Sequence, residues 1–334
     1  MRFKPFAFIL AFSVASVATK AQQTFLERLG VDRLDFGKHL DIGVTLGTTG
    51  FGVDVATPIT DYARLRTGFS YVPKIEVPMT FGVQVGNDPA TSQSKFNKMS
   101  GYLSNLTGYH AKSEVETLGR PNFWNWDVMV DVFPLKNNRH WHVTVGFFVG
   151  PSKVAEAYNK TESMASLMSV NIYNNLYDKL HGLSIRELLK VQIFDFPGLE
   201  DFGTDPDVLI ELQRWLDNNG RMGIWMGKYK TGGDYIMDPD ENCMVKVDMK
   251  VNTFKPYLGV GYDGRMLKNE DRLKIGFDAG IMLWGGTPHL ITHDGTDLIH
   301  DVKHIPGKVG DYVGIIKQFE FFPLLNLRLA YNIF

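Results

Sequence analysis

Apolar and polar side chains alternate with a period of two along several segments of the chain, and this period predicts β-strands with two different faces. Residues 124–132 show it most clearly, because two tryptophans and three valines alternate there with Asn125, Asp127, Met129 and Asp131. The pattern recurs at residues 39–47, 51–56, 63–71, 141–149, 273–283 and 325–333. Most of these segments have about the 9 to 11 residues with which a tilted strand crosses a membrane.

The polar face of these strands indicates which side of the sheet is enclosed. It carries charges of both signs interleaved with glycine, at Asp41, Asp54, Arg64, Arg66, Asp127, Asp131, Lys274, Asp278 and Arg328. In the narrow lumen of a barrel charges must pair and glycine relieves crowding, whereas a solvent-facing surface needs neither. Aromatic residues suited to membrane interfaces fall near the predicted strand ends, at Tyr71, Trp124, Trp126, Trp141, Trp284 and Tyr331. We therefore predict an all-β fold, a transmembrane antiparallel up-and-down β-barrel, with a soluble β-sandwich as the alternative.

Composition is compatible with this barrel and excludes several other classes. Of the 334 residues 44% are hydrophobic, which excludes a disordered chain. The formal charge of −2 argues against a nucleic-acid-binding surface. The single cysteine, Cys243, argues against a disulfide scaffold, and we expect it to be a small buried side chain. The mean hydropathy of −0.12 is what lipid-facing and lumen-facing positions together produce.

Residues 1–21 have the three parts of a secretory signal peptide. Arg2 and Lys4 precede the apolar segment 6–18, and Ala21 offers a cleavage site. A membrane anchor is the alternative, but the apolar segment is too short to span a bilayer. Cleavage would remove three cations and leave 32 Lys+Arg against 37 Asp+Glu, a formal charge of −5.

With this export signal, the lipid-facing strands and a terminal strand ending in Tyr331-Asn332-Ile333-Phe334, the chain resembles the β-barrel outer-membrane proteins of Gram-negative bacteria. The resemblance covers the strand segments and not the long inserts. It implies a location in the cell outer membrane, contact with outer-membrane lipid, and insertion by the barrel assembly machinery. In one respect the chain departs from the family, because the positions two and four residues before Phe334 are Asn332 and Ala330 rather than large apolar residues.

The connections between the predicted strands give the strand number. Short turns at 58–61, 136–139 and 268–271, a tight turn at 47–50, and long connections at 73–121, 151–244 and 285–319 give eight strands. At residues 245–263 the apolar phase shifts by one, which indicates either a bulge or a hairpin. A hairpin would raise the number to ten, with 76–85 and 113–119 as a further pair. An eight-stranded barrel is filled by its own side chains and is not a pore.

The strand count divides the chain into three parts: residues 22–150 form the first part of the barrel, 151–244 a helical extracellular insert, and 245–334 the remaining barrel strands. Within the insert, apolar residues at helical spacing predict a helix over 154–180. Ser184 and Glu187 form a capping box that begins a second helix, and a third spans 206–219. Three such helices can pack together as a cap on the barrel.

Four of the nine histidines lie within residues 289–304. His300 and His304 are four residues apart, the spacing at which two imidazoles on one helix face reach a common metal ion. With His293 and Asp301 they are the candidate metal ligands, and a solvated loop without metal is the alternative.

No residue can be assigned a catalytic role, and we expect no cofactor. Gly259, Gly261 and Gly264 match a dinucleotide-binding motif, but the helix that would bind the pyrophosphate does not follow. The lumen charges are more simply a salt-bridged plug.

The sequence leaves three functions to compare. The leading one is a non-enzymatic outer-membrane barrel with a structural, adhesion or partner-binding role on long extracellular loops, its partner unknown. The second is an outer-membrane hydrolase or metal-binding receptor centred on residues 289–304. The third is a small-solute channel, which the filled lumen disfavours.

Overall fold

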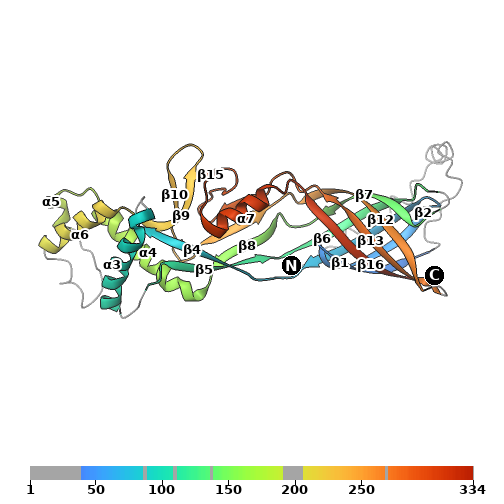
Figure 1. Cartoon of the computed structure of the whole chain (residues 1–334), viewed down its shortest axis with the longest axis horizontal. Coiled ribbons are helices and arrows are strands. Elements are labelled where there is room, and N and C mark those ends of the chain that lie inside the picture. The colour runs from blue at the N-terminus through green and yellow to red at the C-terminus, as the bar shows by residue number, and fades with distance from the viewer. Residues whose placement is uncertain are drawn as a thin grey trace, which may run out of the picture.

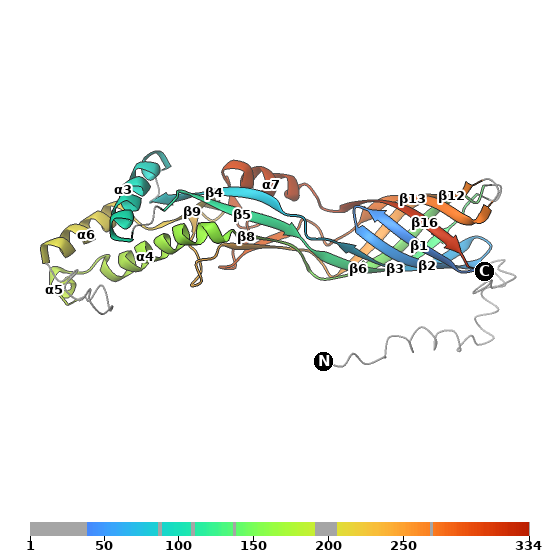
Figure 2. The same ribbon diagram turned by 90° about the horizontal axis from the view of Figure 1, so that it is seen from below.

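The computed structural model describes residues 39–85, 89–107, 111–135, 138–190, 206–267 and 270–333. The predicted signal peptide, residues 1–21, lies outside these ranges. Figures 1 and 2 show an elongated molecule, in which a closed β-barrel at one end is followed along the long axis by a second β-sheet and then by helices.

Eight antiparallel strands form the closed barrel, in the order β1-β16-β13-β12-β7-β6-β3-β2. They are β1 (Asp41–Gly47), β2 (Gly50–Thr60), β3 (Ala63–Val72), β6 (Phe123–Val132), β7 (Trp141–Val149), β12 (Phe254–Leu267), β13 (Glu270–Met282) and β16 (Phe322–Asn332). Pairing of β1 with β16 closes the barrel, from Asp41 opposite Asn332 to Gly47 opposite Asn326. The predicted eight-stranded barrel is confirmed.

The segment 245–263 contains two strands, not one bulged strand. β11 (Lys246–Lys250) belongs to the second sheet and β12 to the barrel, and this change of sheet explains the one-residue shift in apolar phase. The ten-strand alternative is wrong for a related reason. β4 (Val77–Val85) and β5 (Glu114–Pro121) do pair with each other, but they do so in the second sheet.

The second sheet continues five adjacent strands of the barrel wall. The barrel order β3-β6-β7-β12-β13 recurs as β4-β5-β8-β11-β14, where β8 spans Lys153–Asn159 and β14 spans His289–Thr292. The connections are short, and a single residue, Asn122, separates β5 from β6. β9 (Met222–Tyr229) and β10 (Asp234–Met237) extend the sheet beyond β4. We call this second sheet with its helices the head.

The head sheet curls until its two outer strands meet. The Tyr235 hydroxyl on β10 donates a hydrogen bond of 3.0 Å to Thr292 Oγ1 on β14. Residues 293–303, which we call the closing loop, then run from β14 back to β9, where β15 (Val302–Lys303) pairs with Tyr229 and Lys228. The curl and the helices enclose an apolar core that includes Phe96, Val115, Leu167, Leu216, Ile224, Met226 and Cys243.

The insert of residues 151–244 carries the three predicted helices, α4 (Met164–Leu180), α5 (Ile185–Leu188) and α6 (Pro206–Asn219). The capping box of Ser184 and Glu187 is present at the start of α5. The insert is not helical throughout, however, because β8, β9 and β10 also lie within it. Val154 and Tyr158 in β8 are four residues apart, a separation that fits the period of a helix and that of a strand equally well. Their spacing therefore did not identify the strand.

Two further helices complete the head, α3 (Pro89–Thr107) and α7 (Gly307–Lys317), with a 3-10 turn η1 (Thr161–Ser163) before α4. α3 lies in the long connection 73–121 and α7 in the long connection 285–319, and the sequence predicted no helix in either of them. Among the described residues, no helix is both long and apolar enough to cross a membrane.

An apolar joint lies where the barrel wall passes into the head. Trp284, predicted as a membrane-interface residue, is instead only 7% exposed and packs with Val154 and Val251 in this joint. Its ring centroid lies 5.2 Å from that of Phe322, and its indole N–H donates to the Phe319 carbonyl at 3.1 Å. The barrel strands continue into the head sheet, so a residue at the end of a predicted membrane strand need not lie at the membrane interface.

Candidate functional site

The barrel lumen contains a buried ion-pair network centred on two arginines of β3. Arg64 Nη2 lies 2.7 Å from Asp131 Oδ2 and 2.6 Å from Asp263 Oδ2. Arg66 Nη1 lies 2.7 Å from Asp278 Oδ2, and its Nη2 lies 3.2 Å from Asp131 Oδ1. These side chains are almost completely buried, so each charge depends on its partners rather than on water.

Two further pairs fix the strands nearest the chain ends. Arg328 on β16 holds the Asp54 carboxylate of β2 with its Nε at 2.9 Å and its Nη2 at 2.5 Å. Lys274 Nζ on β13 lies 2.8 Å from Asp41 Oδ2 on β1. The predicted plug of paired lumen charges thus extends around the barrel.

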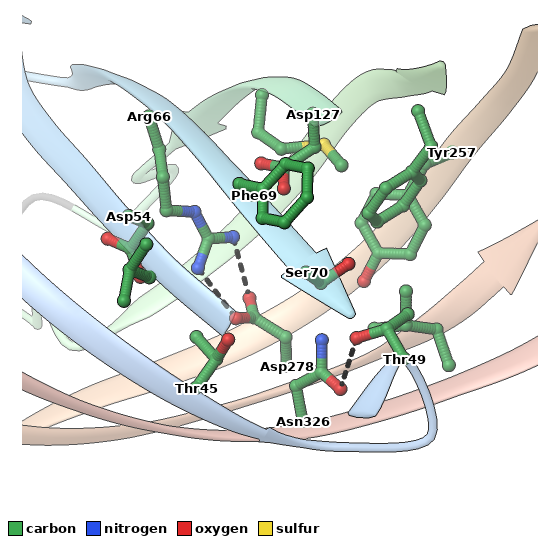
Figure 3. Close-up of a pocket in the computed structure, with 14 residues that line it drawn as sticks. Thr45, Thr49, Asp54, Arg66, Phe69, Ser70, Asp127, Tyr257, Asp278 and Asn326 are labelled. Carbon is green, nitrogen blue, oxygen red and sulfur yellow. Dashed lines mark hydrogen bonds and ion pairs between the residues drawn. The ribbon is translucent and has the colours of Figure 1, made fainter. Parts of the chain in front are cut away.

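The space left between these side chains is small. One cavity of about 40 Å³ lies in the lumen, which is room for about one water molecule. Figure 3 shows Arg66 reaching Asp278 across it, with Asp127 and Tyr257 at its side. A solute path would need these ion pairs to separate.

Asp131, His142 and Asp278 place one ligand atom each close enough together for a metal ion. The same two carboxylates, however, already bind Arg64 and Arg66. A cation would lie beside two guanidinium groups in a low-dielectric interior, where like charges repel strongly. This cluster is therefore a structural network rather than a metal site.

The outside of the barrel is apolar all the way round. Every strand contributes exposed apolar side chains, for example Val44, Val53, Phe69, Trp126, Val145, Leu258, Ile275 and Leu327. A water-soluble monomer rarely exposes a contiguous apolar patch above a few hundred Å². Apolar outside and charged inside is the surface of a membrane-spanning barrel.

An open groove of about 350 Å³ lies beside the joint, lined by Arg120, Trp124, Lys153 and Glu156 among others. Its cations already have acidic partners. Arg120 Nη2 lies 2.5 Å from Glu76, and Lys153 Nζ lies 2.6 Å from Glu156 and 2.9 Å from Asp248. Because these two cations are already paired, the described lining of the groove does not form a site that would attract an anion.

A second polar cluster lies in the head, where β14 meets the closing loop. His289 Nδ1 and His300 Nδ1 lie 2.6 Å and 2.9 Å from one oxygen, Asp297 Oδ2. The two imidazole centroids are 4.5 Å apart. Burial acts to raise the pKa of Asp297, but hydrogen bonds from His289, His300 and nearby backbone N–H groups outweigh it and hold this pKa below its ordinary value.

Of the four predicted metal candidates, only His300 lies in this cluster. His293 Nε2 hydrogen-bonds the Asp238 carbonyl at 2.8 Å, and Asp301 Oδ2 accepts from the Asp297 backbone N–H at 3.0 Å. His304 lies beyond β15 and has a positive φ of 57°. The pairing of His300 with His304 fails because residues 302–303 form a strand rather than a helix.

The chain shows distant similarity to solved structures. Neither a protein-family model nor a curated protein matches the chain. Among solved structures, the chain is similar to Acinetobacter baumannii CarO, at 11% identity over 87% of this chain and 96% of that chain, with a TM-score of 0.35. It is also similar to Acinetobacter baumannii CarO2, at 11% identity over 88% and 98% of the chains, with a TM-score of 0.34. A third similar structure is a major outer membrane protein from Thermus thermophilus, at 13% identity over 88% and 98%, with a TM-score of 0.26.

Several residues of the lumen network and of the histidine cluster were not predicted from the sequence. Lys255, which is 1% exposed and donates to Asn125 Oδ1 at 3.2 Å, and Asp263 both face the lumen from β12. The period of the strand could have identified them, because side chains an even number of residues apart lie on the same face of a strand. Lys255 and Asp263 are an even number of residues from Gly259 and Gly261. For Asp297 no signal existed, since only the folding of the closing loop brings it between two histidines.

Proposed function

We propose that the protein is a non-enzymatic outer-membrane anchor, whose barrel holds a rigid head at the cell surface for binding to a partner. The observation that carries this proposal is the continuation of five adjacent barrel strands into the head sheet in unchanged order. A head attached through five strands cannot turn freely, as a domain on a flexible linker would. The barrel thus both anchors and orients the head.

The connections support one orientation of the barrel in the membrane. At the end opposite the head, β2 ends near the start of β3, β6 near the start of β7 and β12 near the start of β13, and β1 begins and β16 ends there too. Outer-membrane barrels have short periplasmic turns and long extracellular connections. We therefore place the head outside the cell and both termini of the barrel in the periplasm, which agrees with a cleaved signal peptide over residues 1–21.

A partner-binding role is supported by the surface of the head. Met168 and Ile172 lie one turn apart on α4 and are 51% and 40% exposed. Exposed apolar neighbours of this kind are typical of protein contact sites. The channel and hydrolase functions have less support, because buried ion pairs cross the lumen and residues 289–304 contain no serine or cysteine nucleophile.

Site-directed labelling tests the anchor and its orientation. The native thiol, Cys243, is buried, so a single introduced cysteine can be labelled selectively. Lys190→Cys lies in the head and Asp61→Cys in the β2–β3 turn, and both positions are exposed. A membrane-impermeant maleimide should label Lys190→Cys on intact cells, and Asp61→Cys only after the outer membrane is permeabilised. Equal labelling of both in intact cells, or recovery of the chain in the soluble periplasm, contradicts the proposal.

The partner-binding role needs its own comparison. Cells that display the Met168→Glu/Ile172→Glu variant should lose head-dependent attachment to other cells or to envelope fragments. The comparison uses cells with equal amounts of protein at the surface, measured by labelling of Lys190→Cys in both backgrounds. Unchanged attachment would leave the anchor intact but refute a role for this face of α4.

A further inference from the structure

We propose that His289, Asp297 and His300 form a binding site for one divalent transition-metal ion of the zinc class. The site lies in the head, where β14 meets the closing loop, and nothing in the anchoring role requires it. Failure of either proposal therefore leaves the other standing.

The three ligand atoms already converge. His289 Nδ1 and His300 Nδ1 lie 2.6 Å and 2.9 Å from Asp297 Oδ2, although ten residues of chain separate the two histidines. In a tetrahedral zinc site with bonds of about 2.0 to 2.1 Å, ligand atoms lie about 3.3 Å apart. The cluster would need to open by roughly half an ångström to admit the ion. Side-chain rotation alone provides such a movement, because both imidazoles lie at the surface.

The carboxylate is held in place for this role. Its side chain is 8% exposed, and its other oxygen, Oδ1, accepts hydrogen bonds from the backbone N–H groups of Leu290, Ile299 and His300 at 3.3, 3.0 and 3.3 Å. These bonds leave Oδ2 directed at the two imidazoles. Ligating carboxylates in metal sites are fixed in the same way by surrounding hydrogen bonds, which adds to metal affinity.

The donor set selects the kind of ion. Two imidazole nitrogens with one carboxylate oxygen suit zinc and its neighbours in the series, whereas calcium and magnesium prefer oxygen ligands alone. Three protein ligands leave a fourth position, which faces solvent because the His289 and His300 side chains are 56% and 43% exposed. A water molecule or a group from a partner can occupy it.

A bound ion would also strengthen the curl of the head. Asp297 and His300 belong to the closing loop and His289 to β14, so the ion would fasten the loop that joins β14 to β9. Since metal binding stabilises the form that binds it, proteolysis of the closing loop should slow when metal is added.

The test uses the full chain in detergent micelles, prepared without a polyhistidine tag, and zinc alone as the probe. Isothermal titration should give one zinc ion per chain. His289→Ala and His300→Ala should each weaken binding by more than about tenfold, and Asp297→Asn should weaken it as well.

Two control variants separate a built site from ordinary surface histidines. His181 Nδ1 also lies 2.6 Å from a carboxylate, that of Asp217, but within the described ranges no second histidine pairs with that carboxylate. His181→Ala and His304→Ala should therefore bind zinc as the wild type does. If no saturable binding occurs, or if the His289→Ala/His300→Ala variant binds unchanged, the site does not exist. Retained heat-dependent gel mobility shows that each variant is folded, and His289→Gln/His300→Gln gives a second test with side chains of similar length.

Discussion

Arg66 Nη1 and Asp278 Oδ2 form an ion pair of 2.7 Å between β3 and β13, which are four strands apart in either direction around the eight-stranded barrel. The pair therefore spans the lumen from one wall to the opposite wall. No backbone hydrogen bond can connect opposite strands, so this contact ties together what the sheet itself does not.

Replacing Arg66 with methionine should destabilise the barrel by about 3 to 5 kcal/mol, because the Asp278 and Asp131 carboxylates lose a buried cationic partner. Adding Asp278→Asn should recover part of this loss, since one unpaired charge is then removed. Urea denaturation of the protein in detergent micelles measures the free energy of unfolding of both variants. Simple additivity of the two single changes would show that the pair is not coupled.

The wild-type protein should not conduct ions in a planar bilayer, because buried ion pairs cross its lumen. The Arg66→Ala/Asp278→Ala variant removes the cross-lumen contact and should produce small, brief openings. Steady wild-type conductance would contradict the filled lumen and favour the channel function. Asp41→Asn/Lys274→Met is the matched control, because it breaks a lumen pair that does not span the barrel.

Gly261→Ala should destabilise the barrel by about 1 to 3 kcal/mol, as overpacking does in a filled interior. An added Cβ there would meet the His142 ring and would lie 2.8 Å from Asp278 Oδ1. Gly82→Ala is the control, since its Cβ would meet nothing within 4 Å on β4. Thermal loss of heat-dependent gel mobility compares the two, and equal midpoints would show that lumen space is not limiting.

The barrel was predictable because the alternation of apolar and polar residues that indicates its strands lies within short segments of the sequence. Alternation along residues 124–132 reveals both faces of β6 without knowledge of any neighbour, and the charges at Arg64, Asp131 and Asp278 reveal which face is enclosed. The head was not predictable in this way. The alternation of β4 gives no sign that its neighbour β5 follows a helix and lies in a second sheet, because sheet membership depends on contacts distant in sequence.

The histidine cluster shows the same limit. Spacing favoured His300 with His304, since residues four apart are neighbours on a helix, yet the chain forms a strand at residues 302–303. Asp297 and His289 join His300 only because an isolated bridge between Ile291 and Asp297 folds the closing loop back on β14. The residue types were visible in the sequence, but the turn that brings them together was not.

Acid should weaken the closing loop through Asp297. Its pKa is lower in the folded chain than its ordinary value, so its contribution to stability is full above that ordinary value and is lost as the pH falls through the folded pKa. The protection factors of residues 293–303 in hydrogen exchange, which are corrected for the intrinsic effect of pH on exchange, should therefore fall below about pH 4. Asp297→Asn removes this titration, so the protection factors of that variant should already be low at neutral pH and should change less with acid. If acid does not change the hydrogen-exchange protection of residues 293–303 in the wild type, the assigned role of the Asp297 carboxylate is wrong.

Trp284→Ala should separate the unfolding of the head from that of the barrel. Trp284 is 7% exposed in the apolar joint, where it packs against Phe322 and its indole N–H binds the Phe319 carbonyl. Truncating a buried aromatic residue costs about 3 to 5 kcal/mol, and the loss here falls where five strands pass from one sheet into the next. Limited proteolysis should then cut the chain near the joint, while the barrel stays folded. Trp141→Ala is the matched control, because Trp141 is 43% exposed on the outside of the barrel and should leave the joint resistant. If both variants resist protease as the wild type does, the strand continuations alone hold the head in place.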